Sequence, residues 1–265
     1  MNHLLAEAQS LEKAAAAERV EFYGSLISNA PVGGAFRLLD VGCGNGYSIP
    51  EWRRLGVSVV GVDVDSYRLS RWVQEHPAGA PLVLADARNL PFRRGAFSCV
   101  VSSGMIEHVG VAESSNPYHV RALPNRDEAR LSVVRELLAA AAPGAHVLLD
   151  CPNGMFPVDF WHGDRIGAFR VHALPDVLLP SFKDFLAWGR ACGASVLLLP
   201  VGRRLRFRQV GHRWRGRLFT VPMRAFMAGL DRLTHRGVTG LPSRFSPFLV
   251  VRLIETQASP FTTQA

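Results

Sequence analysis

The sequence predicts an α/β protein whose parallel sheet is covered by helices on both faces. Short apolar runs that are typical of strands alternate along the chain with segments whose apolar residues have helical spacing. This alternation indicates parallel strands, because each parallel pair needs a helical crossover. The chain has 265 residues, of which 48% are hydrophobic, so it can bury the core of one large domain.

The elements follow one another in a regular order. A helix is expected over 2–29, where apolar residues recur at helical spacing without glycine or proline before Gly24. Apolar periodicity then predicts strands at 36–41, 57–62, 81–85, 97–103, 145–150, 194–201 and 248–255, and helices at 47–55, 66–76, 126–141 and 181–192.

Residues 203–244, which separate the last two strands, are too many for an ordinary connection. We therefore expect an N-terminal helical segment (1–30), a core (31–202), an insertion (203–244) and a last strand with a tail (245–265).

The positive charge of the chain is concentrated near its C-terminal end. The net charge is +8, and the stretch from Arg203 to Arg252 has twelve arginines but one acid, Asp231. Such a stretch favours nucleic acid, anionic lipid or an acidic substrate as partner, and the alternative is a solvated basic face.

The cysteine pattern and the length of the apolar runs indicate the cellular compartment in which the protein is expected. Cys43, Cys99, Cys151 and Cys192 are far apart and form no CxxC pair, so we expect buried thiols in a reducing compartment and no cysteine metal site. The sequence shows neither a signal-peptide pattern nor a run of about 18 apolar residues. A cytoplasmic protein, attached at most to a membrane surface, is expected.

Glycines and carboxylates gather where the first three strands end. Gly42, Gly44 and Gly46 follow the first strand and let the backbone turn sharply and approach a ligand closely. Asp63 ends the second strand, where it can accept both hydroxyls of a ribose, and Asp86 follows the third, where it can accept from an exocyclic amine. Together these features indicate an adenosine site.

The same loop argues against a diphosphate ligand. Tyr47 stands where a dinucleotide fingerprint needs its third glycine, and no Gly-Lys-Ser/Thr follows. Asp40 would repel phosphate, whereas it suits a cationic amine.

Five stretches resemble, in order and spacing, the motifs of class I S-adenosylmethionine-dependent methyltransferases, specifically the small-molecule, type 11-like family. They are LLDVGCGNG, GVDVD, LADARNLPF, FSCVVSSGMIEHV and LLAAAAPGAHVLLD, within about residues 36–155. The resemblance implies a Rossmann-like seven-stranded sheet with an antiparallel last strand, and S-adenosylmethionine as cofactor. By this resemblance Gly42, Gly44 and Asp40 would hold the methionine end, Asp63 the ribose, Asp86 and the Ala87 backbone the adenine, and Ser102, Ser103 and Gly104 would line the cofactor beside the substrate.

Candidate catalytic residues follow the fourth and fifth strands. Glu107 and His108 resemble the Glu-His pair of quinone-biosynthesis O-methyltransferases, and His162 lies in an aromatic loop that faces substrate in this fold. His108 is expected to be the base ahead of His162, with Glu107 as its partner or, alternatively, as a metal ligand, although no metal site is assigned. The alternatives are that Glu107 caps a short helix over His108, and that Asp159 and His162 only stabilise their loop. His119 has the weakest claim.

The expected function is O-methylation of a hydroxyl on a small or a lipid- or sugar-linked acceptor. An RNA or protein methyltransferase and a non-catalytic S-adenosylmethionine-binding protein are the alternatives, and the absence of a recognisable RNA-binding module argues against nucleic acid. The insertion is expected to cover the substrate: Arg204, Arg206 and Arg208 alternate with apolar residues, and a helix with Pro222 in its first turn has an apolar stripe. An anionic membrane surface would suit this combination, whereas packing against the core is the alternative.

Overall fold

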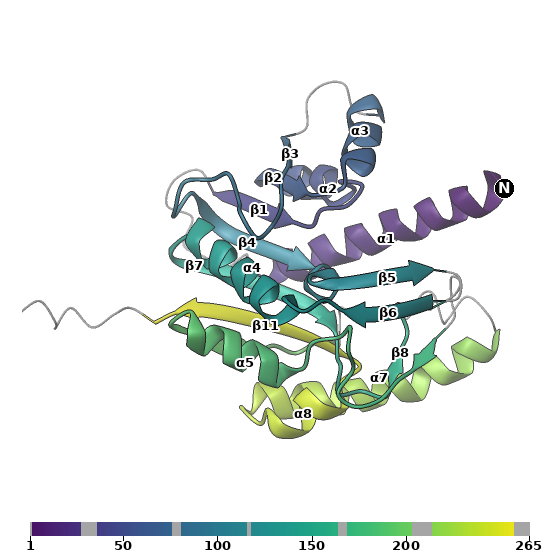
Figure 1. Cartoon of the computed structure of the whole chain (residues 1–265). Coiled ribbons are helices and arrows are strands. Elements are labelled where there is room, and N and C mark those ends of the chain that lie inside the picture. Colours follow the sequence, from purple (N-terminus) through teal and green to yellow (C-terminus); the bar gives the residue numbers. More distant parts are fainter. Residues whose placement is uncertain are drawn as a thin grey trace, which may run out of the picture.

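The computed structural model describes residues 2–27, 36–75, 81–115, 118–163, 169–202 and 214–256. The main sheet contains β1 (Arg37–Val41), β2 (Ser58–Asp63), β3 (Leu82–Leu84), β4 (Phe97–Ser103), β7 (Ala141–Pro152), β10 (Ala194–Leu198) and β11 (Phe248–Glu255), in the order β10-β11-β7-β4-β1-β2-β3 (Figure 1). β11 is antiparallel to both β7 and β10, whereas the pairs among β1, β2, β3, β4 and β7 are parallel. The predicted seven-stranded sheet with an antiparallel last strand is confirmed.

Helices cover both faces of this sheet. They are α1 (Asn2–Ile27), α2 (Ser48–Arg54), α3 (Ser66–Glu75), α4 (Arg126–Ala140), α5 (Phe182–Ala191), α7 (Trp214–His235) and α8 (Gly240–Phe245). Because successive strand residues point to opposite faces, Leu38 and Leu39 of β1 enter two different core clusters. The cluster around Leu38 includes side chains of α1, α2, α3 and α7, and the cluster around Leu39 includes side chains of α4 and α5.

Several elements that extend past the carboxyl ends of the parallel strands were not predicted. A short 3₁₀ helix, η1 (Ile106–His108), follows β4 and leads into a hairpin of β5 (Val111–Ser115) and β6 (Tyr118–Ala122). The pair β8 (Val158–Asp159) and β9 (Arg170–Val171) follows β7. The hairpin, β8 and parts of α1 and α7 reach beyond the same edge of the sheet (Figure 1).

The helix expected from Pro222 onward differs from its prediction in two ways. α7 begins at Trp214, so Pro222 lies inside the helix and the prediction of a first-turn proline is wrong. Met227 and Leu230 are buried in the core cluster, as the apolar stripe predicts, but Phe226 of the same stripe is 45% exposed. The stripe therefore packs against the domain only in part, and residues 203–213, with Arg204, Arg206 and Arg208, lie outside the described residues.

No helix among the described residues is long and apolar enough to cross a membrane. The four cysteines are free: Cys43, Cys99 and Cys151 are buried, as expected, and Cys192 is partly exposed.

Candidate active site

The loop after β1 is built from glycines with left-handed backbone angles. Gly42, Gly44 and Gly46 have φ values of +76°, +58° and +69°, which side chains rarely adopt. The N–H groups of Gly42 and Cys43 both donate to the carbonyl of Val62 in β2, at 2.8 and 3.0 Å. A Cβ atom at Gly42 would lie 2.5 Å from Cγ of Met105, so the loop and the residue after β4 are in close contact.

Two aspartates bracket this loop. Asp63, at the end of β2, accepts from the N–H of Gly44 at 2.7 Å and from the N–H of Asp65 at 2.9 Å. Asp40 is 1% exposed and accepts from the hydroxyl of Ser48 at 2.5 Å, while its Oδ1 has no hydrogen-bond partner in the described part of the chain. Burial raises the pKa of Asp40, although Arg19 and Ser48 oppose that shift. An unpartnered buried carboxylate oxygen suits a ligand ammonium group.

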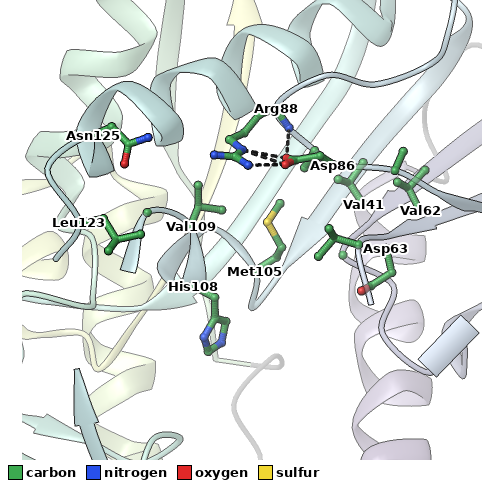
Figure 2. Close-up of a pocket in the computed structure, with 15 residues that line it drawn as sticks. Val41, Val62, Asp63, Asp86, Arg88, Met105, His108, Val109, Leu123 and Asn125 are labelled. Carbon is green, nitrogen blue, oxygen red and sulfur yellow. Dashed lines mark hydrogen bonds and ion pairs between the residues drawn. The ribbon is translucent and has the colours of Figure 1, made fainter. Parts of the chain in front are cut away.

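The third aspartate of the predicted site has a partner of its own. Asp86 lies two residues beyond β3, and the guanidinium of Arg88 donates to both of its carboxylate oxygens (Figure 2). These hydrogen bonds lower the pKa of Asp86. An adenine amine at this position would share the carboxylate with Arg88, because an ionised carboxylate has about four lone pairs.

A cavity of about 320 Å³ opens between these strand ends and η1 (Figure 2). Gly42, Asp63, Asp86 and Ala87 line it, as predicted, and so does His108. The lining also includes residues that the sequence analysis did not single out: Val41, Val62, Val64, Ala85, Arg88, Met105, Val109, Gly110, Leu123 and Asn125. Asp40, Gly44 and Gly46 are outside this lining and lie in or beside the glycine loop.

The predicted serines after β4 belong to a buried hydrogen-bond network. Ser103 donates its hydroxyl to Asp150 at 2.6 Å, and Tyr23 of α1 donates to the other oxygen of Asp150 at 2.5 Å. Ser102 is also buried and has no partner for its hydroxyl, and Gly104 follows with a φ of +62°. None of the three predicted residues Ser102, Ser103 and Gly104 lines the cavity, and the network instead fixes α1 to the strand ends.

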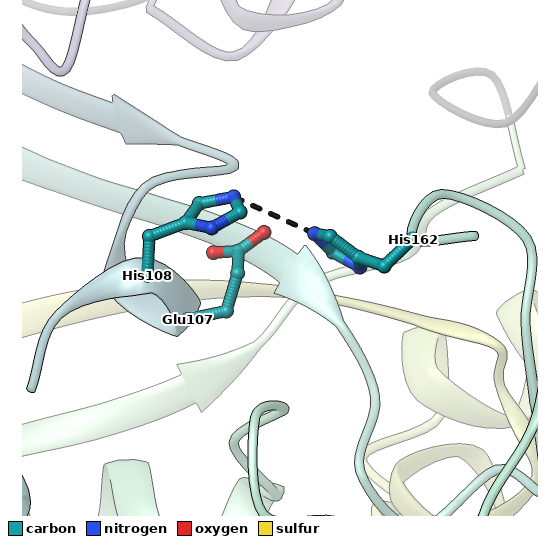
Figure 3. Close-up of side chains that lie close together, drawn as sticks. All are labelled: Glu107, His108 and His162. Atoms are coloured by element: carbon teal, nitrogen blue, oxygen red, sulfur yellow. Dashed lines mark hydrogen bonds between the residues drawn. The ribbon is translucent and has the colours of Figure 1, made fainter. Parts of the chain in front are cut away.

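Glu107, His108 and His162 lie together beside the cavity, although β4 and β8 bring them from distant parts of the chain. One ligand-type atom from each of the three lies within 4.8 Å of the others, and Nε2 of His108 is 3.4 Å from Nε2 of His162 (Figure 3). Glu107 is 1% exposed, and burial raises the pKa of its carboxyl group. The side chain of His108 is 43% exposed and that of His162 is 10% exposed.

Each imidazole is oriented by a carboxylate. Nδ1 of His108 lies 2.6 Å from Glu113 in β5, and Nδ1 of His162 lies 2.8 Å from Asp159 in β8. Burial opposes the charge on His108, but the hydrogen bond that its ring donates to Glu113 and the charge of Glu107 raise its pKa above the ordinary value. Burial raises the pKa of Asp159 and Glu113, yet their hydrogen bonds to the two histidines lower it overall.

A buried arginine positions the η1 turn that carries Glu107 and His108. Arg130 of α4, which is 3% exposed, donates to the carbonyls of Glu107 and Leu178 at 2.7 and 2.6 Å and to that of Val109 at 3.1 Å. The alternative in which Glu107 caps a short helix is not observed, because Glu107 lies inside η1, whose cap, Met105, makes no side-chain hydrogen bond. Sequence reasoning missed this arginine because the carbonyls it binds lie far away in the chain.

Asp159 and His162 stabilise their own loop, as the alternative in the sequence analysis states, and Asp159 also orients the ring of His162. Asp159 accepts from the N–H groups of Trp161 and His162, at 2.9 and 3.2 Å, and so stabilises its own loop while it also holds Nδ1 of His162. The aromatic residues of the loop pack inward, since Phe160 is buried and the ring of Trp161 lies 5.0 Å from that of Phe248. His119 is exposed on β6, outside the cluster.

The strand order, the glycine loop with positive φ angles and the carboxylates at the next two strand ends define a class I S-adenosylmethionine-dependent methyltransferase domain. Residues 39–123 match the family described as "Methyltransferase domain", and S-adenosylmethionine is the cofactor of this class.

Comparison with individual proteins agrees with this class. The chain is 35% identical over 71 residues to the biotin biosynthesis bifunctional protein BioHC of Cellvibrio japonicus, an alignment that covers 27% of this chain and 14% of that protein. It is 44% identical over 82 residues to a tRNA U34 carboxymethyltransferase of Pseudomonas aeruginosa, again 27% of this chain and 24% of the relative. These matches span less than a quarter of the relatives' own length.

A solved structure shows the same fold over most of the chain. It is that of the Haemonchus contortus phosphoethanolamine N-methyltransferase 2 in complex with phosphomonomethylethanolamine and S-adenosylhomocysteine, with a TM-score of 0.52. The similarity covers 88% of this chain and 52% of that chain at 16% sequence identity, which establishes the fold alone.

Proposed function

We propose that this protein transfers the methyl group of S-adenosylmethionine to a hydroxyl oxygen of a small or a lipid- or sugar-linked acceptor. The observation that carries the proposal is the cluster of Glu107, His108 and His162 at the cavity. His108 lines the cavity and also contacts His162, so groups that handle a proton lie beside the expected cofactor site. Methyl transfer to oxygen needs removal of the hydroxyl proton, whereas transfer to an amine free base does not.

The residues of the chain supply binding, orientation and proton removal. Bound S-adenosylmethionine carries a sulfonium methyl group that is already activated, so in-line positioning of the acceptor provides much of the acceleration. Asp63 would bind the ribose hydroxyls, and Oδ1 of Asp40, which has no hydrogen-bond partner among the described residues, would bind the ammonium group. The histidine cluster would take the proton of the acceptor hydroxyl as the methyl group is transferred, and S-adenosylhomocysteine would be the second product.

An RNA acceptor is the second candidate function. The tRNA-modifying relative and the arginines of residues 203–252 favour it, but the alignment covers only 27% of this chain and 24% of the relative. The similarity therefore leaves most of both chains unmatched. A protein acceptor, or binding of the cofactor without turnover, has no specific observation in its favour.

The exposed surface of α7 and α8 supports an acceptor with an anionic or lipid part. Exposed apolar and basic side chains occur together in and between these helices: Val221, Phe226, Leu241 and Phe245 with Arg224, Arg232, Arg236 and Arg244. Asp231, the one acid of this stretch, is occupied by the N–H groups of Val201 and Gly202, at 2.7 and 2.6 Å. Basic and apolar groups act together at anionic membrane surfaces, so we propose peripheral attachment there.

The test is release of S-adenosylhomocysteine from S-adenosylmethionine in the presence of catechols, polyols, lipid-linked sugars or total tRNA as acceptors. Native mass spectrometry of the purified protein would narrow the choice of acceptor. We expect turnover with a hydroxyl compound, and we expect His108→Ala and His162→Ala to lower turnover by about 10²–10⁴ with little change in S-adenosylhomocysteine affinity. His119→Ala is the matched control. Normal turnover in both cluster variants, or turnover with tRNA alone, would contradict the proposal.

A further inference from the structure

The two imidazoles of the cluster face each other through their Nε2 atoms, which are 3.4 Å apart. Nδ1 of His108 is bonded to Glu113 and Nδ1 of His162 to Asp159, at 2.6 and 2.8 Å. Because an ionised carboxylate only accepts hydrogen bonds, each Nδ1 carries a proton, and in a neutral ring Nε2 then has a lone pair. A cation between the two Nε2 atoms would bind both rings in this form.

Glu107 adds an unsatisfied acceptor at the same place. The residue is 1% exposed, and its Oε2 has no hydrogen-bond partner among the described residues. A buried carboxylate without a partner is costly unless a positive group compensates it. The carboxyl group points toward the two rings (Figure 3), and the three ligand-type atoms lie within 4.8 Å of one another.

We infer that Glu107, His108 and His162 bind a divalent transition-metal ion of the zinc class. A tetrahedral ion with bonds of about 2.0–2.1 Å places its ligand atoms about 3.3–3.4 Å apart. The observed separation between the two Nε2 atoms, 3.4 Å, matches this edge. Two imidazoles and one carboxylate are the ligand set of catalytic zinc sites, which keep a fourth position open, whereas Mg²⁺ prefers oxygen ligands.

The surroundings of the two histidines are those of metal ligands. Histidines that bind a metal usually donate their other ring N–H to a carboxylate, which fixes the ring orientation. Here both carboxylates are themselves held: the hydroxyl of Tyr118 donates to Glu113 at 2.9 Å, and the guanidinium of Arg170 donates to Asp159 at 3.1 Å.

The inference deepens the proposed function and rests on it for the role of the ion. His108 lines the cofactor cavity, so a divalent cation held by the cluster would lie near the acceptor, and a hydroxyl bound to such a cation would lose its proton more readily. The cluster would then act on the hydroxyl through the ion and not as a direct base.

The experiment measures metal binding without turnover. Untagged full-length protein is treated with a chelator, freed of it, and titrated with Zn²⁺ alone by calorimetry and with Co²⁺ alone by visible absorbance. We expect one Zn²⁺ per chain with a dissociation constant below about 1 μM, and absorption bands of Co²⁺ bound by nitrogen and oxygen in a tetrahedral site. Glu113→Gln should weaken Zn²⁺ binding about 10–100-fold, and His108→Ala and His162→Ala should weaken it further.

Controls separate this inference from the proposed function. His119→Ala should bind Zn²⁺ like the parent, and S-adenosylhomocysteine affinity in every variant shows that the fold persists. Zn²⁺ binding that is equal in the parent and in a His108→Ala/His162→Ala double variant would overturn the site. Methyl transfer to a hydroxyl that persists at full rate in metal-free protein would overturn the role of the ion but leave oxygen methylation standing. Tight Zn²⁺ binding without methyl transfer to any hydroxyl would support the metal site but contradict oxygen methylation.

Discussion

Replacement of Gly42 by alanine should weaken cofactor binding in addition to lowering stability. The residue has a φ of +76°, where a side chain costs about 1–2 kcal/mol. The new Cβ would also lie 2.5 Å from Cγ and 2.7 Å from Cβ of Met105. These atoms are near the backbone of Met105, so the contact is relieved only if the whole Met105 side chain shifts.

The overlap at Met105 determines how large the binding effect is. Met105 lines the cavity, so it can relieve the contact in the free protein by moving into that space. A bound cofactor occupies the same space, and the overpacking cost of about 1–3 kcal/mol then falls on binding. We expect the dissociation constant of S-adenosylhomocysteine to rise about 5–150-fold in Gly42→Ala.

Gly56 offers a matched control with the same backbone angle. Its φ is +75°, and a Cβ atom there would meet nothing within 4 Å. Gly56→Ala should therefore lose about 1–2 kcal/mol of unfolding free energy, measured in urea, but keep the parent affinity by calorimetry. Parent affinity in Gly42→Ala would refute the reasoning. An equal loss of affinity in Gly42→Ala and Gly56→Ala would mean that general destabilisation, and not the contact with Met105, causes the loss.

Three further predictions concern other parts of the molecule. Asp63→Ala should weaken S-adenosylhomocysteine binding by about 2–4 kcal/mol while the protein stays folded, and unchanged affinity by calorimetry would refute the ribose assignment. Burial raises the pKa of Asp176, but hydrogen bonds from Arg170 lower it overall, so its contribution to stability is present above the unfolded pKa and is lost as pH falls through the lower folded pKa. Urea unfolding should accordingly show Asp176→Asn less stable than the parent by about 2–4 kcal/mol at pH 7, with a gap that shrinks only below about pH 4; a gap that is constant down to pH 2 would contradict this. The parent should co-sediment with anionic but not neutral vesicles at low salt, and a quadruple Arg→Gln variant at positions 224, 232, 236 and 244 should not; negligible sedimentation of the parent with both vesicle types would reject membrane attachment.

The sheet and the cofactor loop were predictable because their signals are local. Each strand of the core is a short apolar run, and the left-handed angles at Gly42, Gly44 and Gly46 are angles that glycine alone adopts readily. Asp63 was found because the end of a parallel strand fixes its place at the edge where ligands bind.

The groups that orient the histidines were not predictable, because long-range contacts determine them. Glu113 and Tyr118 lie in a polar hairpin without the apolar alternation of a half-buried strand, so nothing in that stretch indicates pairing. Arg130 binds carbonyl groups that are distant in the chain. Arg170 meets Asp159 only because of the conformation of the loop between them. Phe226 is exposed although its spacing fits the buried stripe, since the position of α7 on the core and not its periodicity decides which side chains are covered.

The insertion of β11 between β7 and β10 has a consequence for biosynthesis. β11 follows both of its neighbours in the chain yet occupies a place inside the sheet, so β7 and β10 each present an open hydrogen-bonding edge until residues 248–255 emerge from the ribosome. An open edge invites pairing with other chains. A nascent chain that stalls before Phe248 would therefore depend on chaperones to remain unaggregated, while release of the C-terminal strand closes both edges in one step.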